Sequence, residues 1–268
     1  MITIAPTGGL ANRMRVIDSA IELNKKLNSK LIIKWHLNKE LNCRFENLFI
    51  KPHAINQISN IKENIIITFI RKFINKFLPF LYRLKYDIII NQKKIDTFSK
   101  ECLDNIFSNT QKHIFITTYS RFFPSDNTYK EFHPVNVLKT RIINFNNKKK
   151  PIIGLHIRRT DHIKSINKSP TEGFIEIIKQ KLKENKKTKF FLSTDSKEEE
   201  ILLLNIFPEN IVVNKKRSLN RNKPEAIEDA LVDLYCLSKC EKLYGSYWSS
   251  FTQTAADIGK IDFKVVVK

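Results

Sequence analysis

The second half of the chain alternates short apolar segments with longer amphipathic ones, and this alternation limits the fold more than any other feature. The predicted strands are Ile152–Ile157, Lys189–Ser193, Ile211–Val213, Lys242–Gly245 and Phe263–Val267. The predicted helices are Thr171–Asn185, Ser196–Asn205, Glu225–Lys239 and Ser249–Ile258. Strands that alternate with helices form a parallel sheet with helices on both faces, so this half is predicted to be an α/β domain.

The first half opens on a similar pattern. The predicted elements are a strand at Ile2–Ala5, a glycine loop at Gly8–Arg13, a helix from about Met14 to Leu27, strands at Leu31–Trp35 and His113–Tyr119, and a helix at Pro134–Phe145. The opening elements are typical of a Rossmann-like domain, whereas residues 53–108 are predicted to be helical and irregular. The polar segment 146–151 ends in a proline and predicts a boundary between domains 1–147 and 148–268.

A cluster of charged residues follows the strand Ile152–Ile157. His156, Arg158, Arg159 and Asp161 lie at its carboxyl end, where parallel α/β sheets bind ligands. Two adjacent guanidinium groups favour a diphosphate or another dianion, because arginine makes planar, bidentate phosphate contacts. The alternative is an Arg–Asp salt bridge that closes a loop.

Other loops at strand ends carry anion-binding residue types. The segment Gly245–Phe251 leads into a helix N-terminus, where backbone N–H groups and serine hydroxyls form an anion site. Ser249 and Ser250 are equally consistent with ordinary helix capping, and Gly8 with Gly9 with a simple tight turn. We expect the loops 8–13, 156–161, 193–196 and 245–251 to meet in a cleft between the two domains.

Two aspartates lie in the predicted helix Glu225–Lys239, before the serine-rich loop along the chain. Asp229 and Asp233 are one turn apart and predict either a solvated helix face or a carboxylate that accepts the N–H pair of a guanine edge. The chain has no Asp-x-Asp motif, which many sugar-nucleotide enzymes use to hold a metal ion on the diphosphate. Paired arginines without that motif predict that arginine charge replaces the metal.

The formal net charge of +20 limits the classes of binding partner that the chain is expected to have. Such a balance fits nucleic acid, an anionic membrane surface or a nucleotide-phosphate substrate, but no nucleic-acid-reading motif or zinc-finger spacing is present, so nucleic acid is not expected. Residues 65–85 form a basic amphipathic helical pattern, with apolar side chains on one face and Lys72, Lys76 and Arg83 on the other. This helix is predicted either to pack on its own domain or to attach to an anionic membrane.

The N-terminal sequence, the length of the apolar runs and the cysteines predict where in the cell the protein is located. The chain enters a strand directly after Met1, no apolar run reaches transmembrane length, and its four cysteines form no CxxC pair. We therefore expect a cytoplasmic protein, with the basic helix placing it at the inner face of the plasma membrane in the membrane alternative. Cys236 and Cys240, one helical turn apart, are predicted to be core residues.

Four segments resemble motifs of the fucosyltransferase superfamily that includes bacterial nodulation fucosyltransferases, α1,6-fucosyltransferases and protein O-fucosyltransferases. Residues 156–161 are similar to its HxRRxD motif, and residues 191–195 to its second motif. Residues 233–238, continuing to 249–251, are similar to the third motif, and residues 8–13 to the N-terminal glycine loop. The resemblance spans nearly the whole chain apart from residues 40–130.

This resemblance implies a GT-B-like fold, with two Rossmann-like domains facing across a cleft. Domain 1–147 would lie on the acceptor side and domain 148–268 would bind the GDP-sugar. The implied activity is an inverting, metal-independent glycosyltransferase with GDP-fucose as the donor substrate and no cofactor. The implied acceptor is a glycan, such as a bacterial surface polysaccharide or a lipid-linked oligosaccharide.

The resemblance also implies residue roles. Arg158 would bind the β-phosphate and stabilise the leaving GDP, His156 would contact the donor, and Asp233 would read guanine. Ser249, Ser250 and Phe251 would hold the diphosphate, and Arg159 and Asp161 would brace the loop. The remaining implied substrate-binding residues are Gly8, Gly9, Asn12, Arg13, Thr194 and Asp195.

The catalytic base is the point of departure from the family pattern. The α1,6 enzymes place a glutamate a few residues beyond HxRRxD, where this chain has residues 164–167, Lys-Ser-Ile-Asn. Glu172 and His162 are the nearest candidates, and Glu172 is assigned as the catalytic one. Two other functions stay open: the same scaffold with GDP-mannose or a GDP-heptose as donor, and a non-catalytic GDP-sugar- or glycan-binding protein.

Overall fold

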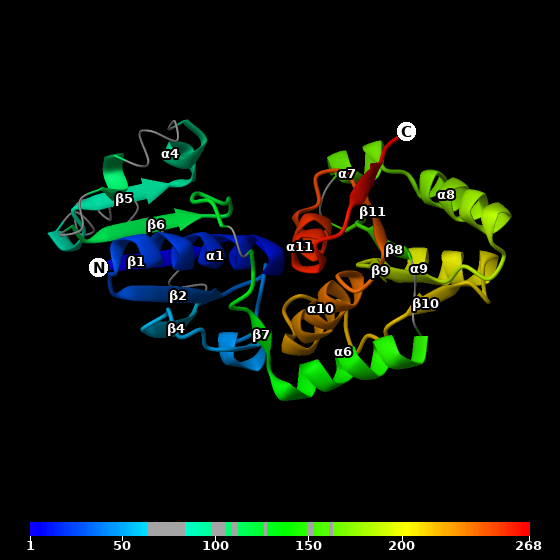
Figure 1. Cartoon of the computed structure of the whole chain (residues 1–268), viewed down its shortest axis with the longest axis horizontal. Helices are drawn as coiled ribbons and strands as arrows, with labels where there is room; N and C mark the ends of the chain where they lie inside the picture. Colours follow the sequence, from blue (N-terminus) through cyan, green and yellow to red (C-terminus); the bar gives the residue numbers. More distant parts are fainter. Residues whose placement is uncertain (64–83, 98–104, 109–111, 126–127, 150–152, 161–162) are drawn as a thin grey trace. The chain divides into compact units, whose positions relative to one another are not determined.

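The computed structural model describes the 268 residues except 64–83, 98–104, 109–111, 126–127, 150–152 and 161–162. The chain divides into two compact units, Met1–His133 and Pro134–Lys268. Each unit contains its own five-stranded sheet, and every strand pairing in these two sheets is parallel. The predicted α/β class with parallel sheets is therefore confirmed (Figure 1).

The first sheet has the strand order β4-β2-β1-β6-β5. Its strands are β1 (Ile2–Pro6), β2 (Leu31–Leu37), β4 (Gln57–Lys62), β5 (Ile88–Asn91) and β6 (Ile114–Thr118). The other elements before residue 134 are α1 (Leu10–Leu27), η1 (Phe45–Asn47) and α4 (Gln92–Thr97), and β3 (Phe49–Ile50) pairs with β7 (His133–Pro134) in a separate small sheet.

The second sheet has the order β10-β9-β8-β11-β12. Its strands are β8 (Ile153–Ile157), β9 (Phe190–Thr194), β10 (Ile211–Val213), β11 (Lys242–Ser246) and β12 (Phe263–Val266). The helices of this unit are α6 (Asn136–Lys149), α7 (Ile163–Lys168), α8 (Thr171–Glu184), α9 (Lys197–Ile206), α10 (Pro224–Leu237) and α11 (Ser250–Gly259).

The first strand of each unit lies at the centre of its sheet. The chain proceeds outward from β1 and from β8 on one side, and later strands, β6 and β11, pair on the other side. Strand order therefore reverses between β1 and β6 and again between β8 and β11. Open α/β sheets bind ligands beyond the carboxyl ends of the strands at such topological switch points.

The two faces of β8 have different environments. Alternate residues Ile153, Leu155 and Ile157 are buried in an apolar cluster with Phe174 of α8 and Leu203 of α9. The intervening residue His156 points to the opposite face, where its ring meets α11. One face thus supplies the core and the other can position polar side chains at the strand end.

The structure corrects part of the sequence analysis. The prediction that residues 53–108 are helical and irregular is wrong for β4 and β5, which are strands of the first sheet. Helix α6 lies in the second unit, so the observed division falls before this helix, whereas the sequence placed the boundary near its C-terminal end. Most of the basic pattern 65–85 lies outside the described residues. The core assignment of Cys236 and Cys240 is confirmed, because both are buried.

Candidate functional site at the β8–β11 switch point

Polar side chains from the ends of β8, β9 and β11 come together at the switch point of the second sheet. The register pairs His156 with Gly245 and Ile157 with Thr194, so the three strands end at one level. The Arg158 N–H donates to Ser246 Oγ at 3.0 Å, and the Arg159 N–H donates to a carboxylate oxygen of the β9–α9 loop at 2.7 Å. Three of the four loops that the sequence placed together therefore meet within this unit.

His156 is buried beneath the first turn of α11. Its Nδ1 lies 2.9 Å from Thr252 Oγ1 and 3.1 Å from Ser249 Oγ, and its ring stacks on Phe251 with centroids 4.8 Å apart. Thr252 reaches it because residue 245 is glycine: a Cβ there would lie 2.3 Å from Thr252 Oγ1. Burial lowers the pKa of His156 to about 4, and the nearby charge of Arg158 acts in the same direction, so the imidazole is neutral at pH 7.

The N-terminus of α11 is capped and faces the same strand ends. Ser249 is the N-cap residue, and its Oγ accepts a hydrogen bond from the Thr252 N–H at 3.3 Å. The capping interpretation of Ser249 is thus correct. The first N–H groups of a helix have no acceptor within the helix, and helix N-termini bind anions through such groups.

The two adjacent arginines have different environments. The backbone of Arg158 is fixed through its N–H to Ser246, and its carbonyl accepts from Arg159 Nη1 at 3.0 Å. The side chain of Arg158 is half-buried, and its positive charge contributes to lowering the pKa of His156. Arg159 instead donates from Nε to Glu199 Oε1 at 2.7 Å and from Nη2 to Thr171 Oγ1 at 3.0 Å. The Arg159 guanidinium is therefore occupied by internal partners.

Thr171 completes this internal ion pair. Its hydroxyl donates to Glu199 Oε1 at 2.6 Å, and the side chains of Arg159 and Glu199 are only 11% and 13% exposed. Removing one partner of such a buried pair is expected to destabilise a protein by about 3–5 kcal/mol. Helix α8 starts at Thr171, with Pro170 as its N-cap and no side-chain cap.

The β9–α9 loop ties the β8 loop to its neighbours. Asp195 accepts from the Arg159 N–H through Oδ1 and from Thr160 Oγ1 through Oδ2, both at 2.7 Å. Arg221 approaches Oδ2 of the same carboxylate at 3.5 Å. Thr194 is buried, and its Oγ1 accepts from the N–H of residue 196 at 3.2 Å. These two predicted substrate-binding residues hold the loop in its conformation.

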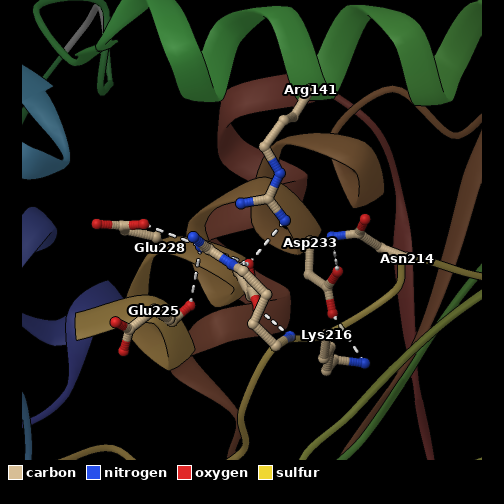
Figure 2. A network of polar contacts seen from close by, with 8 residues as sticks. Arg141, Asn214, Lys216, Glu225, Glu228 and Asp233 are labelled. Carbon is tan, nitrogen blue, oxygen red and sulfur yellow. Dashed lines mark hydrogen bonds and ion pairs between the residues drawn. The ribbon is translucent and has the colours of Figure 1, made fainter. Parts of the chain in front are cut away.

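Asp233 lies on α10 directly behind the end of β9. Its Oδ2 accepts from Ser193 Oγ at 2.9 Å and lies 3.3 Å from Lys216 Nζ, and its Oδ1 accepts from Asn214 Nδ2 at 3.2 Å. Figure 2 shows Asn214 and Lys216 on either side of this carboxylate. Burial raises the pKa of Asp233, against the opposing charge of Lys216 and the hydrogen bonds from Ser193 and Asn214.

Asp229, one turn earlier on α10, is completely buried. Arg217 donates to it from its backbone N–H at 2.5 Å and from Nη2 at 2.7 Å, and Arg141 Nη2 donates at 2.7 Å from α6, as Figure 2 shows for Arg141. Burial alone would raise the pKa of Asp229, but these hydrogen bonds outweigh it and hold the pKa below its ordinary value. The solvated-face interpretation of the two aspartates is therefore wrong.

The proposed base and its neighbourhood are only partly described. Glu172 is exposed in the first turn of α8, one residue after the Thr171 that contacts Arg159. His162, the other candidate base, lies outside the described residues, as does Asp161, which the resemblance expects to brace the loop. Glu172 therefore lies in the same unit as the arginine pair and is adjacent in sequence to a residue that contacts Arg159.

The glycine loop of the first unit is built around Arg13. This guanidinium is 0% exposed and donates to the carbonyls of Gly8 and His36 and, at 3.0 Å, to Asn38 Oδ1. Gly8 has φ +79°, and a Cβ there would lie 2.7 Å from Asn12 Nδ2, whereas nothing lies within 4 Å of a Cβ at Gly9. Gly9 is the N-cap of α1 without a side-chain cap.

Several site residues carried no recognisable signal in the sequence. Glu199 belongs to an acidic first turn that suits the helix dipole, and only the fold turns it toward Arg159. Lys216 and Arg221 lie in the irregular segment after β10, which has no motif. Ser246 and Thr252 flank the recognised serine pair, and their proximity to Arg158 and His156 follows from strand register.

Two features of the described residues bear on ligands and membranes. Within the part of the chain that the structure describes, every helix is too short or too polar to span a bilayer. Among those same residues, no cluster of three or more His, Cys, Asp or Glu side chains is arranged to hold a metal ion.

Comparisons with known proteins bear on the fold. No protein-family model matches the chain. No curated protein matches it either.

Several solved structures match the fold over nearly the whole chain. NodZ α1,6-fucosyltransferase soaked with GDP-fucose gives a TM-score of 0.63 at 16% identity, covering 96% of this chain and 92% of that one. A mutant of Arabidopsis thaliana FUT1 in complex with GDP gives 0.60 at 12% identity, covering 98% and 69%. POFUT1 in complex with GDP-fucose gives 0.59 at 13% identity, covering 99% and 97%. At these identities the likeness establishes a fold shared with fucosyltransferases.

Proposed function

We propose that the protein is a glycosyltransferase that moves fucose from GDP-fucose to a glycan acceptor, with inversion and without a metal ion. In this proposal the second unit binds the GDP-sugar and the first unit binds the acceptor. The fold shared with fucosyltransferases, three of which were solved with GDP or GDP-fucose, supports this proposal.

One observation carries the proposal: Arg158 and the N-terminus of α11 lie at the same switch point, joined through Ser246 and His156. A guanidinium and a helix N-terminus each favour a phosphate group. Because His156 is buried and neutral, it adds no charge and instead fixes the first turn of α11 through Ser249 and Thr252. The arrangement suits a diphosphate that gains negative charge during a reaction.

The proposed reaction is a direct displacement at the anomeric carbon. An acceptor hydroxyl forms the new C–O bond while the bond from that carbon to the diphosphate oxygen breaks, and the electron pair leaves with GDP. Arg158 and the first-turn N–H groups of α11 stabilise that charge, since preorganised donors act most strongly where charge develops. Glu172 takes the proton from the acceptor hydroxyl.

The remaining roles follow the family resemblance. The resemblance assigns guanine recognition to Asp233 and substrate contact to the Gly8–Gly9 loop of the first unit. The acceptor is a bacterial surface polysaccharide or a lipid-linked oligosaccharide. In the membrane alternative, the basic segment 65–85 holds the enzyme at the anionic inner surface of the plasma membrane.

The test is a thermal-shift panel of GDP, UDP, CDP, ADP, GDP-fucose and GDP-mannose with EDTA present. A ligand at 100 times its dissociation constant stabilises the folded state by about 2.7 kcal/mol, so binding is readily detected. We expect GDP and GDP-fucose to raise the melting temperature and the other nucleoside diphosphates to leave it unchanged. Turnover of GDP-fucose is then followed by GDP release, with and without oligosaccharide acceptors.

The other possible results of these experiments would each overturn or change a stated part of the proposal. No shift with any guanine nucleotide overturns the proposal, and a shift that requires divalent cations overturns its metal independence. A larger shift and faster turnover with GDP-mannose assign the other GDP-sugar. Tight GDP-fucose binding with neither transfer nor slow hydrolysis indicates a binding protein.

A further inference from the structure

Trp248 is an exposed aromatic side chain at the same switch point. It follows β11 by two residues and precedes the N-cap of α11, and it is 67% exposed. Its φ of +57° lies in the left-handed region, which an L-residue with a bulky side chain rarely adopts. Backbone strain of this kind persists only where the surroundings impose it.

The loop is fixed on both sides of this residue. Before it, the Tyr247 N–H donates to Ser169 Oγ at 2.7 Å, and Lys168 Nζ lies 4.5 Å from the centroid of the Tyr247 ring. After it, Ser249 Oγ accepts from the Thr252 N–H and contacts His156. The indole is thus presented to solvent by a rigid turn, and its centroid lies 6.0 Å from that of the Tyr247 ring.

Apart from the half-buried rings of Tyr247 and Phe251, the rest of the described switch point is polar. Arginine, serine and threonine groups there recognise phosphate oxygens and hydroxyls, but they offer no surface for the apolar C–H face of a sugar ring. A rigid indole supplies such a surface at low entropic cost. In the proposed reaction, the donor hexose is joined to a phosphate bound at α11, and the acceptor sugar must approach its anomeric carbon.

We infer that the Trp248 indole packs on the C–H face of a pyranose ring at the transfer site. The ring belongs either to the donor hexose or to the terminal sugar of the acceptor. This inference rests on the proposed function, because only a bound GDP-sugar brings a hexose to this turn.

Tryptophan fluorescence provides a direct test, because the chain has two tryptophans and the other one, Trp35, is 0% exposed. Acrylamide quenching therefore reports mainly on Trp248. Quenching is measured with GDP, GDP-fucose and GDP-mannose, and then with GDP plus neutral oligosaccharides of glucose, N-acetylglucosamine and mannose. The same titrations are run with vesicles of anionic phospholipid in place of sugar.

We expect GDP alone to change quenching little and a sugar-bearing ligand to reduce the quenching constant at least twofold, with a blue-shifted emission. Protection by GDP-fucose assigns the ring to the donor. Protection only when an oligosaccharide joins GDP assigns it to the acceptor. A chain that carries Trp248→Phe with Ile201→Trp, which places the indole at a 48%-exposed site on α9, is expected to show no protection.

Three results would overturn the inference: equal protection by GDP and GDP-fucose, no protection by any sugar-bearing ligand, or protection by vesicles alone. Failure of the proposed function is separate, because it appears as the absence of a melting shift with GDP.

Kinetics give a second readout. Trp248→Ala is expected to raise the KM for the sugar-bearing substrate about tenfold while GDP affinity stays constant, and Trp248→Phe is expected to restore most of it.

Discussion

The two switch points of this protein have the same sheet geometry but use arginine differently. At the first, between β1 and β6, Arg13 is completely buried and its guanidinium donates to acceptors of the chain itself. At the second, between β8 and β11, Arg159 has the same kind of internal role, whereas Arg158 is half-buried beside a capped helix N-terminus. One position braces a loop, and in the proposed function the other adds a charge where the donor diphosphate binds.

The degree of burial distinguishes these two arginines, Arg13 and Arg158. Burial lowers the pKa of Arg13 to about 10, against the raising effect of Glu40 and Glu63, and the side chain remains charged at pH 7. A charge held among protein acceptors stabilises the fold and offers little to a ligand. An arginine at a switch point is therefore evidence for ligand binding only when the surrounding structure leaves its face accessible.

The largest expected effect follows from removing the charge at the second switch point. Arg158→Ala should lower the rate of fucose transfer about a thousandfold, about 4 kcal/mol of transition-state stabilisation, while the melting temperature stays close to that of the unchanged chain. Turnover of GDP-fucose and a thermal melt measure the two quantities. Arg44→Ala, a substitution at a 60%-exposed side chain, is the matched control and should leave both unchanged. Near-normal turnover of Arg158→Ala would show that this arginine does not serve the reaction.

The complementary change at the first switch point should act on stability. Arg13→Ala removes the guanidinium donor to the Gly8 and His36 carbonyls and one of the donors to Asn38, and it creates a cavity, so the free energy of unfolding should fall by about 4 kcal/mol. Urea unfolding in a Trp248→Phe background measures this, because Trp35 lies 5.0 Å from the Arg13 guanidinium and becomes the reporter of the first unit. A loss below about 1 kcal/mol would contradict the bracing role.

The sequence predicted the fold where packing follows local patterns. The apolar runs of β8, β9, β10 and β11 are buried on both faces, as parallel strands usually are, and their positions agree with the structure to within about one residue. Strand β4, Gln-Ile-Ser-Asn-Ile-Lys, is mostly half-exposed and has too little apolar contrast to indicate a strand. Strand β5 continues an apolar region whose spacing favoured a helix, and only pairing with β6 makes it a strand.

The sequence predicted which loops form the candidate site, but it did not predict all the side chains that pair with one another there. The predicted strand ends correctly indicated that His156, Arg158 and Ser249 lie close together, because parallel strands end at one edge of a sheet. Which carboxylates face those residues depends on how helices α9 and α10 rotate against the sheet. Glu199 and the buried state of Asp229 were therefore missed, although both lie within recognised helices.

The buried imidazole at the second switch point should make stability depend on pH. Its folded pKa of about 4 lies below the ordinary value of 6.5, so the unfolded chain takes up the proton first as pH falls. The stabilisation that the neutral imidazole gives the folded state is fully present above pH 6.5. It is lost as the pH falls from 6.5 to 4, which lowers the free energy of unfolding by at most about 3 kcal/mol. Chemical unfolding of the unchanged chain and of His156→Gln across this range isolates the effect. Parallel pH profiles for the two chains would show that burial does not act on His156 in this way.

A smaller effect is expected at the positive-φ position of the first switch point. Gly8→Ala should destabilise the fold by about 1–2 kcal/mol, because alanine disfavours φ +79° and its Cβ would press on Asn12. Urea unfolding in the Trp248→Phe background measures the change. Trp35 is again the reporter, and unchanged stability would mean that the loop readily adopts another conformation.

The smallest expected stability effect, and the sharpest comparison, comes from the neighbouring glycine. Gly9 has φ −74° and open space where a Cβ would lie, and it caps α1 without a side-chain acceptor. Gly9→Ser should therefore stabilise the first unit by about 0.5 kcal/mol by capping the helix. If the loop also contacts substrate, as proposed, the added hydroxymethyl group should raise the KM for the acceptor or donor sugar while folding improves. Improved folding with unchanged kinetics would instead leave the loop as a tight turn braced by Arg13, and the two switch points would then differ in function as well as in their use of arginine.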